Sequence, residues 1–141
     1  MRRASLVLFA LVLGVSGCGL WPTGDDIDES LDQQLRSVAG PWTGTSTPLT
    51  LDFQLTQGSG TTVTGSGTMK EAAAAGSVPI TLSGTFQRPD LSLTISGMVF
   101  EGKAMTGTIQ GSYTTVAGIS APLVMTGGGS TREVTILLQE K

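Results

Sequence analysis

Apolar and polar residues alternate along most of the chain that follows residue 40. In residues 49–56 the alternation is uninterrupted, and the polar positions carry hydroxyl, carboxyl and amide side chains. The apolar phase of this segment is formed by Leu49, Leu51, Phe53 and Leu55. A period of two is typical of a β-strand that buries one face. The same period recurs with apolar positions at Ile80, Leu82, Phe86, Leu91, Leu93, Ile95, Met105, Ile109, Leu123, Met125, Val134, Ile136 and Leu138.

Segments rich in glycine, proline and serine separate these runs, and such segments bound strands and form turns. Thr-Gly or Ser-Gly pairs recur inside the runs, and glycine within a strand often marks the bend that a closed barrel needs. Short hairpins throughout favour an all-β fold, an eight-stranded up-and-down antiparallel barrel, with a β-sandwich as the alternative. The predicted strands are 42–47, 49–56, 61–69, 77–87, 90–100, 103–113, 118–126 and 132–139.

Residues 26–39 carry a different period, close to that of an α-helix. Their apolar stripe is formed by Ile27, Leu31, Leu35 and Val38. Asp26 and Glu29 stand at capping-box positions, and Gly40 follows the last apolar position. The pattern predicts one short amphipathic helix over residues 26–39, directly before the barrel.

The first 17 residues have the three-part pattern of a secretory signal peptide, with two arginines, an apolar run over residues 6–15 and then small residues. This run is too short to span a bilayer, which takes about 20 residues. It leads into Val15, Ser16, Gly17 and Cys18, and this tetrad resembles the bacterial lipobox. In that family a diacylglycerol is attached to the cysteine sulfur, the chain is cut before it, and the new amino group is usually acylated. The resemblance implies that Cys18 is the lipid attachment site.

The lipobox resemblance also implies a place in the cell. The residue after the cysteine is Gly19, whereas an aspartate at this position would resemble an inner-membrane retention signal. We therefore expect an outer-membrane lipoprotein that faces the periplasm, with the outer face of a plasma membrane as the alternative. The domains are then a cleaved signal peptide (1–17), a lipidated cysteine with its tether (18–25), the helix (26–39) and the barrel (40–141).

The composition argues against several kinds of chemistry. The chain has no histidine, and its only cysteine is assigned to lipid, so we expect no histidine-based triad, no metal and no cofactor beyond the acyl lipid. The carboxylates after residue 40 are spread over turns and polar strand faces, and their spacing indicates no catalytic pair. The net charge is −3 and no basic stripe is present, so we expect no nucleic acid as a partner. We therefore expect a protein that is not an enzyme.

Gly40, Pro41 and Trp42 follow the predicted helix and open the first predicted strand. This G-x-W element is similar to that of lipocalins and related calycins, including the avidin-like barrels. In lipocalins the tryptophan closes one barrel end beneath an arginine from the last strand. The resemblance implies that place for Trp42, with Arg132, at the start of the last predicted strand, as the matching arginine.

Two non-enzymatic functions fit these observations. An eight-stranded barrel has an interior that is either filled by side chains or holds one small ligand. We favour a filled barrel that acts as a structural or protein-docking module of the cell envelope. The alternative is a lipocalin-like carrier or receptor for an apolar small molecule. The residues that would line its ligand are Trp42, Phe53, Phe86, Leu93, Met105, Ile109 and Met125.

The topology also predicts which end of the barrel meets a partner. The first and last strands of an eight-stranded antiparallel barrel have their outer ends on the same side, and the helix and tether join there. The loops at 45–48, 70–76, 101–102 and 127–131 would lie at the opposite end. Because binding usually lies on loops held by a rigid scaffold, we expect the partner at that end.

Overall fold

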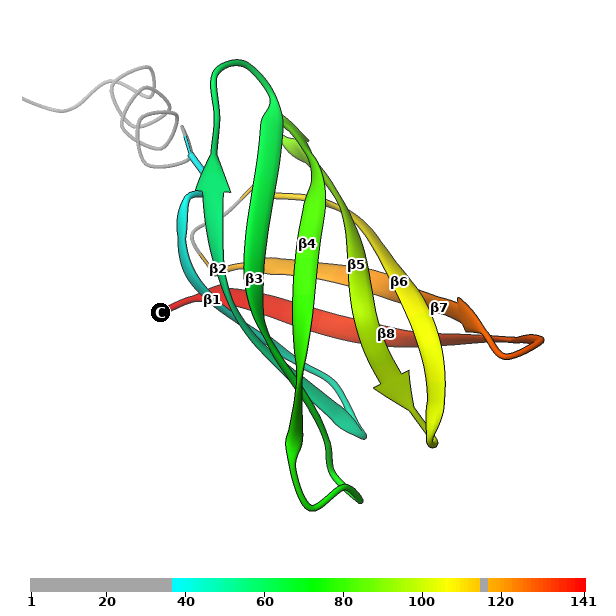
Figure 1. The fold of residues 1–141 in the computed structure, drawn as a ribbon. Helices are drawn as coiled ribbons and strands as arrows, with labels where there is room; N and C mark the ends of the chain where they lie inside the picture. The colour runs from blue at the N-terminus through cyan, green and yellow to red at the C-terminus, as the bar shows by residue number, and fades with distance from the viewer. Residues whose placement is uncertain (1–36, 115–116) are drawn as a thin grey trace, which may run out of the picture.

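The computed structural model describes residues 37–114 and 117–141. These residues form a closed barrel of eight antiparallel strands that neighbour one another in chain order (Figure 1). The predicted up-and-down barrel is confirmed, the sandwich alternative is wrong, and every predicted strand boundary lies within two residues of the observed one. The strands are β1 (Gly40–Thr45), β2 (Leu49–Gln57), β3 (Thr62–Glu71), β4 (Ser77–Gln87), β5 (Asp90–Phe100), β6 (Lys103–Ser112), β7 (Ile119–Gly127) and β8 (Ser130–Glu140).

The predicted helix lies outside the described residues except for its last three positions. Residues 37–39 have no regular secondary structure, so the predicted helix end at residue 39 is wrong. The backbone N–H of Val38 donates to Gln57 Oε1 at 3.1 Å, and that of Ala39 donates to Ser37 Oγ at 3.0 Å. Side-chain oxygens therefore satisfy these two donors.

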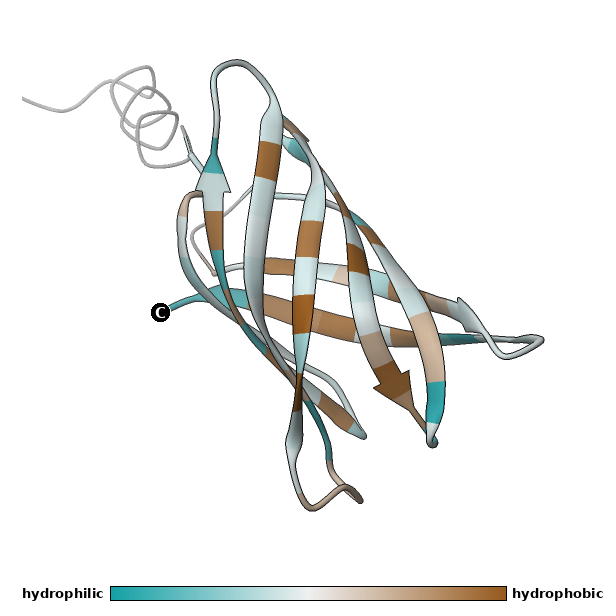
Figure 2. Ribbon diagram, in the orientation of Figure 1, coloured by the Kyte–Doolittle hydropathy of each residue, from teal (hydrophilic) through white to brown (hydrophobic). Residues whose placement is uncertain are grey.

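The strand phase read from the sequence is the phase observed. On β2 the apolar residues are buried and Thr50, Asp52, Gln54 and Thr56 are exposed. Apolar and polar bands alternate along the strands in Figure 2, as expected where one face of each strand lines the core. No polar or charged residue of the described part of the chain is buried, so the core is wholly apolar.

The alternating strand directions define two ends of the barrel. The proximal end holds the start of β1, the end of β8 and the connections at 58–61, 88–89 and 113–118. The distal end holds the connections at 46–48, 72–76, 101–102 and 128–129. Two of the distal connections are two-residue turns with positive φ at both positions, 51° and 73° at Glu101 and Gly102, and 55° and 75° at Gly128 and Gly129. Such turns match the twist of a tight β-hairpin.

Two of the eight ladders are short. β1 pairs with β8 over four positions, from Trp42 opposite Glu140 to Thr45 opposite Leu137. β6 pairs with β7 over four positions, and the ladder ends at Ile109 opposite Leu123, directly before Pro122. A proline has no backbone N–H to donate, so it cannot extend this ladder in full.

Candidate functional site

The seven residues predicted to line a ligand all lie in the barrel core. Their side chains come from β1, β2, β4, β5, β6 and β7, and each is at most 5% exposed. They belong to one apolar cluster together with residues of β3 and β8. The structure therefore brings these seven residues together, as both a packing role and a ligand-lining role require.

Inward-facing glycines show how closely this core is filled. A Cβ built on Gly44 would lie 2.9 Å from Ile136 Cδ1, and one built on Gly107 would lie 2.5 Å from Met98 Sδ and 2.9 Å from Leu123 Cδ1. Optimal contact between carbon atoms is at about 3.5–4.0 Å. The space beside these buried glycines is therefore already occupied by the side chains of neighbouring strands.

Trp42 closes the core at the proximal end. The residue is 1% exposed, and its indole Nε1 donates to the backbone carbonyl of Val38 at 2.9 Å. The ring of Tyr113 stands edge-on to it, with 5.5 Å between the centroids and 74° between the planes. Phe86 also contacts Tyr113, with ring centroids 6.5 Å apart and 53° between the planes. Trp42 thus lies at the proximal end of the core, and its aromatic partner is the only tyrosine of the chain.

Tyr113 was not among the predicted site residues, although it lies on the inward phase two residues after Gly111. Burial raises the pKa of its phenol, and the carboxylate of Glu140 beside it raises that pKa further. Its backbone N–H donates to the carbonyl of Pro89 at 2.8 Å. Tyr113 therefore joins the core, the end of β8 and the β4–β5 turn.

Arg132 lies far from Trp42. It pairs with Met125 near the distal end of β8, whereas Trp42 pairs with Glu140 at the proximal end. The Arg132 side chain is 55% exposed and forms an ion pair with Glu101, Nη2 to Oε2, at 3.3 Å. It does not cover the tryptophan ring, because the last strand of an up-and-down barrel begins at the end opposite to the start of the first.

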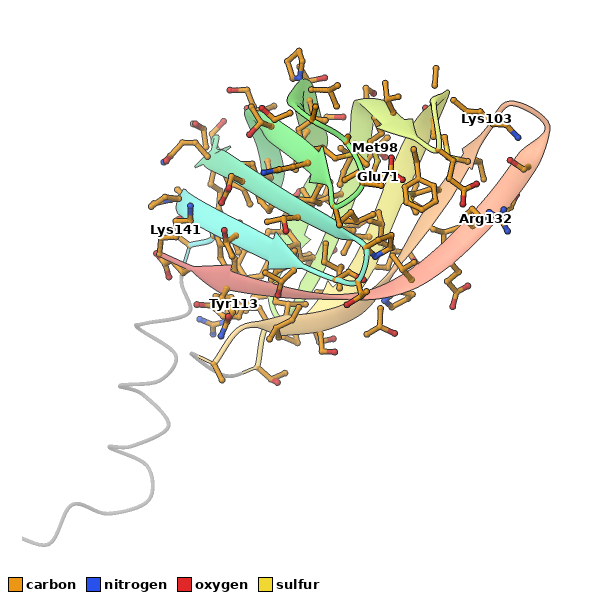
Figure 3. The ribbon with its side chains drawn as sticks, turned by 90° about the horizontal axis from the view of Figure 1, so that it is seen from below. Glu71, Met98, Lys103, Tyr113, Arg132 and Lys141 are labelled. Atoms are coloured by element: carbon orange, nitrogen blue, oxygen red, sulfur yellow. The ribbon has the colours of Figure 1, made fainter. Side chains whose placement is uncertain are left out.

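Side-chain and backbone contacts link three connections at the distal end to one another and to the start of β8. The N–H of Ala72 donates to the carbonyl of Pro48 at 2.8 Å, and the N–H of Glu101 donates to Glu71 Oε2 at 3.1 Å. With the Arg132–Glu101 ion pair, these contacts form a series that we call the distal rim. In Figure 3 Arg132 and Lys103 lie beside the β7–β8 hairpin, on the side away from Tyr113 and Lys141. Three of the four predicted distal loops, at 45–48, 70–76 and 101–102, are thus linked to one another and to β8.

The C-terminal residue reaches across β1 to β2. Lys141 Nζ lies 2.6 Å from Asp52 Oδ1, and Thr43 Oγ1 donates to the same carboxylate. The hydrogen bond from Lys141, and after it the one from Thr43, hold the pKa of Asp52 below the usual range of an aspartate. Both partners of the ion pair are about half exposed, so it contributes less than about 1 kcal/mol. It adds modestly to the closure of the barrel beside the short β1–β8 ladder.

The remaining predicted site residue, Cys18, lies outside the described residues. Within residues 37–114 and 117–141, no helix is long and apolar enough to cross a membrane. The same residues bring together no group of three or more potential metal ligands from histidine, cysteine, aspartate and glutamate.

Comparisons of the chain with protein-family models, with curated proteins and with solved structures gave no match. The class of protein is therefore defined by its architecture alone, a small closed antiparallel β-barrel with an apolar core.

Proposed function

We propose that this protein is a bacterial lipoprotein whose barrel is a non-enzymatic docking module of the cell envelope. The observation that carries the proposal is the filled core, where side chains of neighbouring strands press against the inward-facing glycines. A filled interior leaves the outer surface and the two ends of the barrel for binding. Saturable binding of a fluorescent fatty acid inside the barrel, quenching Trp42, would instead favour the apolar carrier.

The anchor is the lipid on Cys18, in an outer membrane facing the periplasm. Each buried methylene of an acyl chain contributes about 0.8 kcal/mol, and two or more chains anchor a protein stably. Because Cys18 is the only cysteine, cells grown with a radioactive fatty acid should label the wild-type protein and not the Cys18→Ser variant. Ser5→Ala, which leaves the lipobox intact, is the control and should label normally. Equal labelling of wild type and Cys18→Ser would refute the anchor.

The partner is a protein of the envelope, and it docks at the distal rim. The chain that leads from Cys18 joins the barrel at the proximal end, so the distal end faces away from the membrane. Hydrogen bonds and an ion pair link three connections of the distal rim to one another and to β8, and this lowers the conformational entropy lost on binding.

A photo-crosslinking residue tests this orientation in cells. Placed at Ser77 or Ser130, beside distal connections, it should capture the partner. Placed at Ser59, in a proximal connection, it should capture none. Capture from Ser59 alone would overturn the distal docking site, and it would leave the labelling result at Cys18 unaffected.

A further inference from the structure

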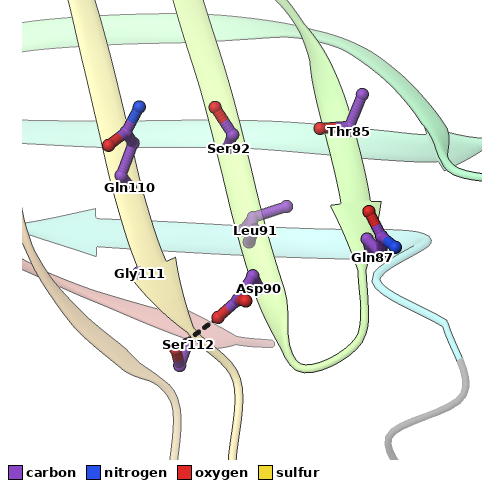
Figure 4. Close-up of a pocket in the computed structure, with 8 residues that line it drawn as sticks. All are labelled: Thr85, Gln87, Asp90, Leu91, Ser92, Gln110, Gly111 and Ser112. Carbon is purple, nitrogen blue, oxygen red and sulfur yellow. Dashed lines mark hydrogen bonds between the residues drawn. The ribbon is translucent and has the colours of Figure 1, made fainter.

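A groove of about 420 Å³ runs across the outer face of β4, β5 and β6 at the proximal end (Figure 4). Polar side chains from three strands surround it, and Leu91 and Gly111 complete its lining. The strand register sets the polar side chains in two transverse rows, one of Thr85, Ser92 and Gln110, the other of Gln87, Asp90 and Ser112. The groove is distinct from both the core and the distal rim.

The chemistry of these six side chains selects a ligand class. The two amides and three hydroxyls each supply both a donor and an acceptor, and Asp90 supplies acceptors only. The lining contains no cation to hold an anion, and a single carboxylate is a poor site for a divalent metal. An apolar ligand would take water from these polar groups and leave them unpaired. A neutral ligand that carries many hydroxyl groups can donate hydrogen bonds to the acceptors of the groove and accept them from its donors.

The spacing of the rows fits such a ligand. Neighbouring strands lie about 4.8 Å apart, so three strands extend over about 10 Å, which is comparable with two linked pyranose rings. Ser112 Oγ donates to Asp90 Oδ1 at 2.7 Å, which holds the carboxylate in place. The bond from the Tyr113 N–H to the Pro89 carbonyl fixes the β4–β5 turn beside it. The groove is therefore pre-organised, which lowers the cost of binding.

We infer that this groove binds a neutral saccharide through Gln87, Gln110 and Asp90. The site lies on the flank of the barrel at its proximal end and needs neither the lipid on Cys18 nor a partner at the distal rim. The inference therefore goes beyond the proposed docking function and stands or falls separately from it.

The test is a titration of the isotope-labelled mature protein with chitotriose and, separately, with maltotriose, followed by amide NMR. The protein is kept in micelles of a detergent without a sugar headgroup. Binding should move the amide signals of residues 85–92 and 110–112 and saturate. Saturation by either sugar supports the inference, and the sugar that binds more tightly shows whether acetamido groups contribute.

Paired variants separate the groove from general effects on the fold. Gln87→Ala combined with Gln110→Ala should weaken the affinity about tenfold or more, because two side-chain hydrogen-bond partners are lost. Gln54→Ala, an exposed glutamine on β2, should leave the affinity unchanged. Unaltered amide signals with both sugars, or shifts confined to the distal connections, would overturn the inference.

Discussion

Replacing Phe53 or Thr50 by aspartate places the same charge on opposite faces of β2. Phe53 is 5% exposed and lies opposite Trp42 of β1 and Gly67 of β3. Removing a buried phenylalanine ring costs about 3–5 kcal/mol. The carboxylate of Phe53→Asp would also lie in a core without any buried polar residue among those described, which adds several kcal/mol.

The sum approaches the whole stability of a small domain, which is about 5–15 kcal/mol. Phe53→Asp should therefore be largely unfolded at room temperature. Thr50 is exposed and pairs with Lys70 on β3, so an aspartate there meets an opposite charge across the strands. Such cross-strand pairs contribute about 0.2–1 kcal/mol, and Thr50→Asp should be neutral or slightly stabilising.

Urea denaturation followed by far-ultraviolet circular dichroism measures both free energies of unfolding. The wild type and Thr50→Asp should give similar midpoints and slopes, while Phe53→Asp should show no folded baseline. Similar losses from the two variants would refute the strand phase. A folded Phe53→Asp would refute the filled core, because only a hydrated interior tolerates that carboxylate.

Gly84→Val should lower the midpoint of thermal unfolding by several degrees, because a Cβ at Gly84 would lie 1.9 Å from the Ser92 carbonyl oxygen. Gly76→Ala is the control and should change the midpoint little, because the space around Gly76 is open. Equal midpoints for the two variants would refute the close approach of β4 to β5. The pKa of the Tyr113 phenol is higher in the native state than in the unfolded chain, so the native state keeps the proton to higher pH. The resulting contribution of Tyr113 to the free energy of unfolding is complete below pH about 10 and is lost as the pH rises through the native pKa. Denaturant titrations at several alkaline pH values should show a decline that is smaller in Tyr113→Phe, and an identical decline in both proteins would contradict the raised pKa.

The strands and their buried faces were predictable because both depend on local information. Apolar and polar residues alternate without interruption from Leu49 to Thr56. Glu101-Gly102 and residues 127–130 are glycine-containing sequences typical of tight hairpin turns. Contacts between strands distant in the chain are not local, and the contact between Trp42 and Tyr113 arises only when the barrel closes. The transverse rows of the groove span the β4–β5 and β5–β6 hairpins. Their alignment depends on the register shift between Ile95 and Met98, which the alternation of residue types does not reveal.

Two local expectations failed for reasons that lie in the tertiary structure. The helical period of the N-terminal segment includes Val38, and this residue is indeed buried, at 1% exposure. Its burial comes from the barrel end, however, where its carbonyl accepts from the Trp42 indole. The match between Arg132 and the lipocalin arginine rests on its strand alone. Its position along β8 decides its partner, which is Glu101 at the distal end.

The ladder between β1 and β8 affects the order in which the barrel folds. Trp42 and Glu140 pair across 98 residues, whereas every other ladder joins strands that follow one another in the chain. Closing a loop of this length costs more entropy than forming a hairpin, so the β1–β8 ladder should form last. During synthesis, β1 emerges early and keeps an unpaired edge until residues 137–140 are available to pair with it. A chain that stops before residue 137 is an open sheet with two free edges, and such edges recruit other strands into aggregates.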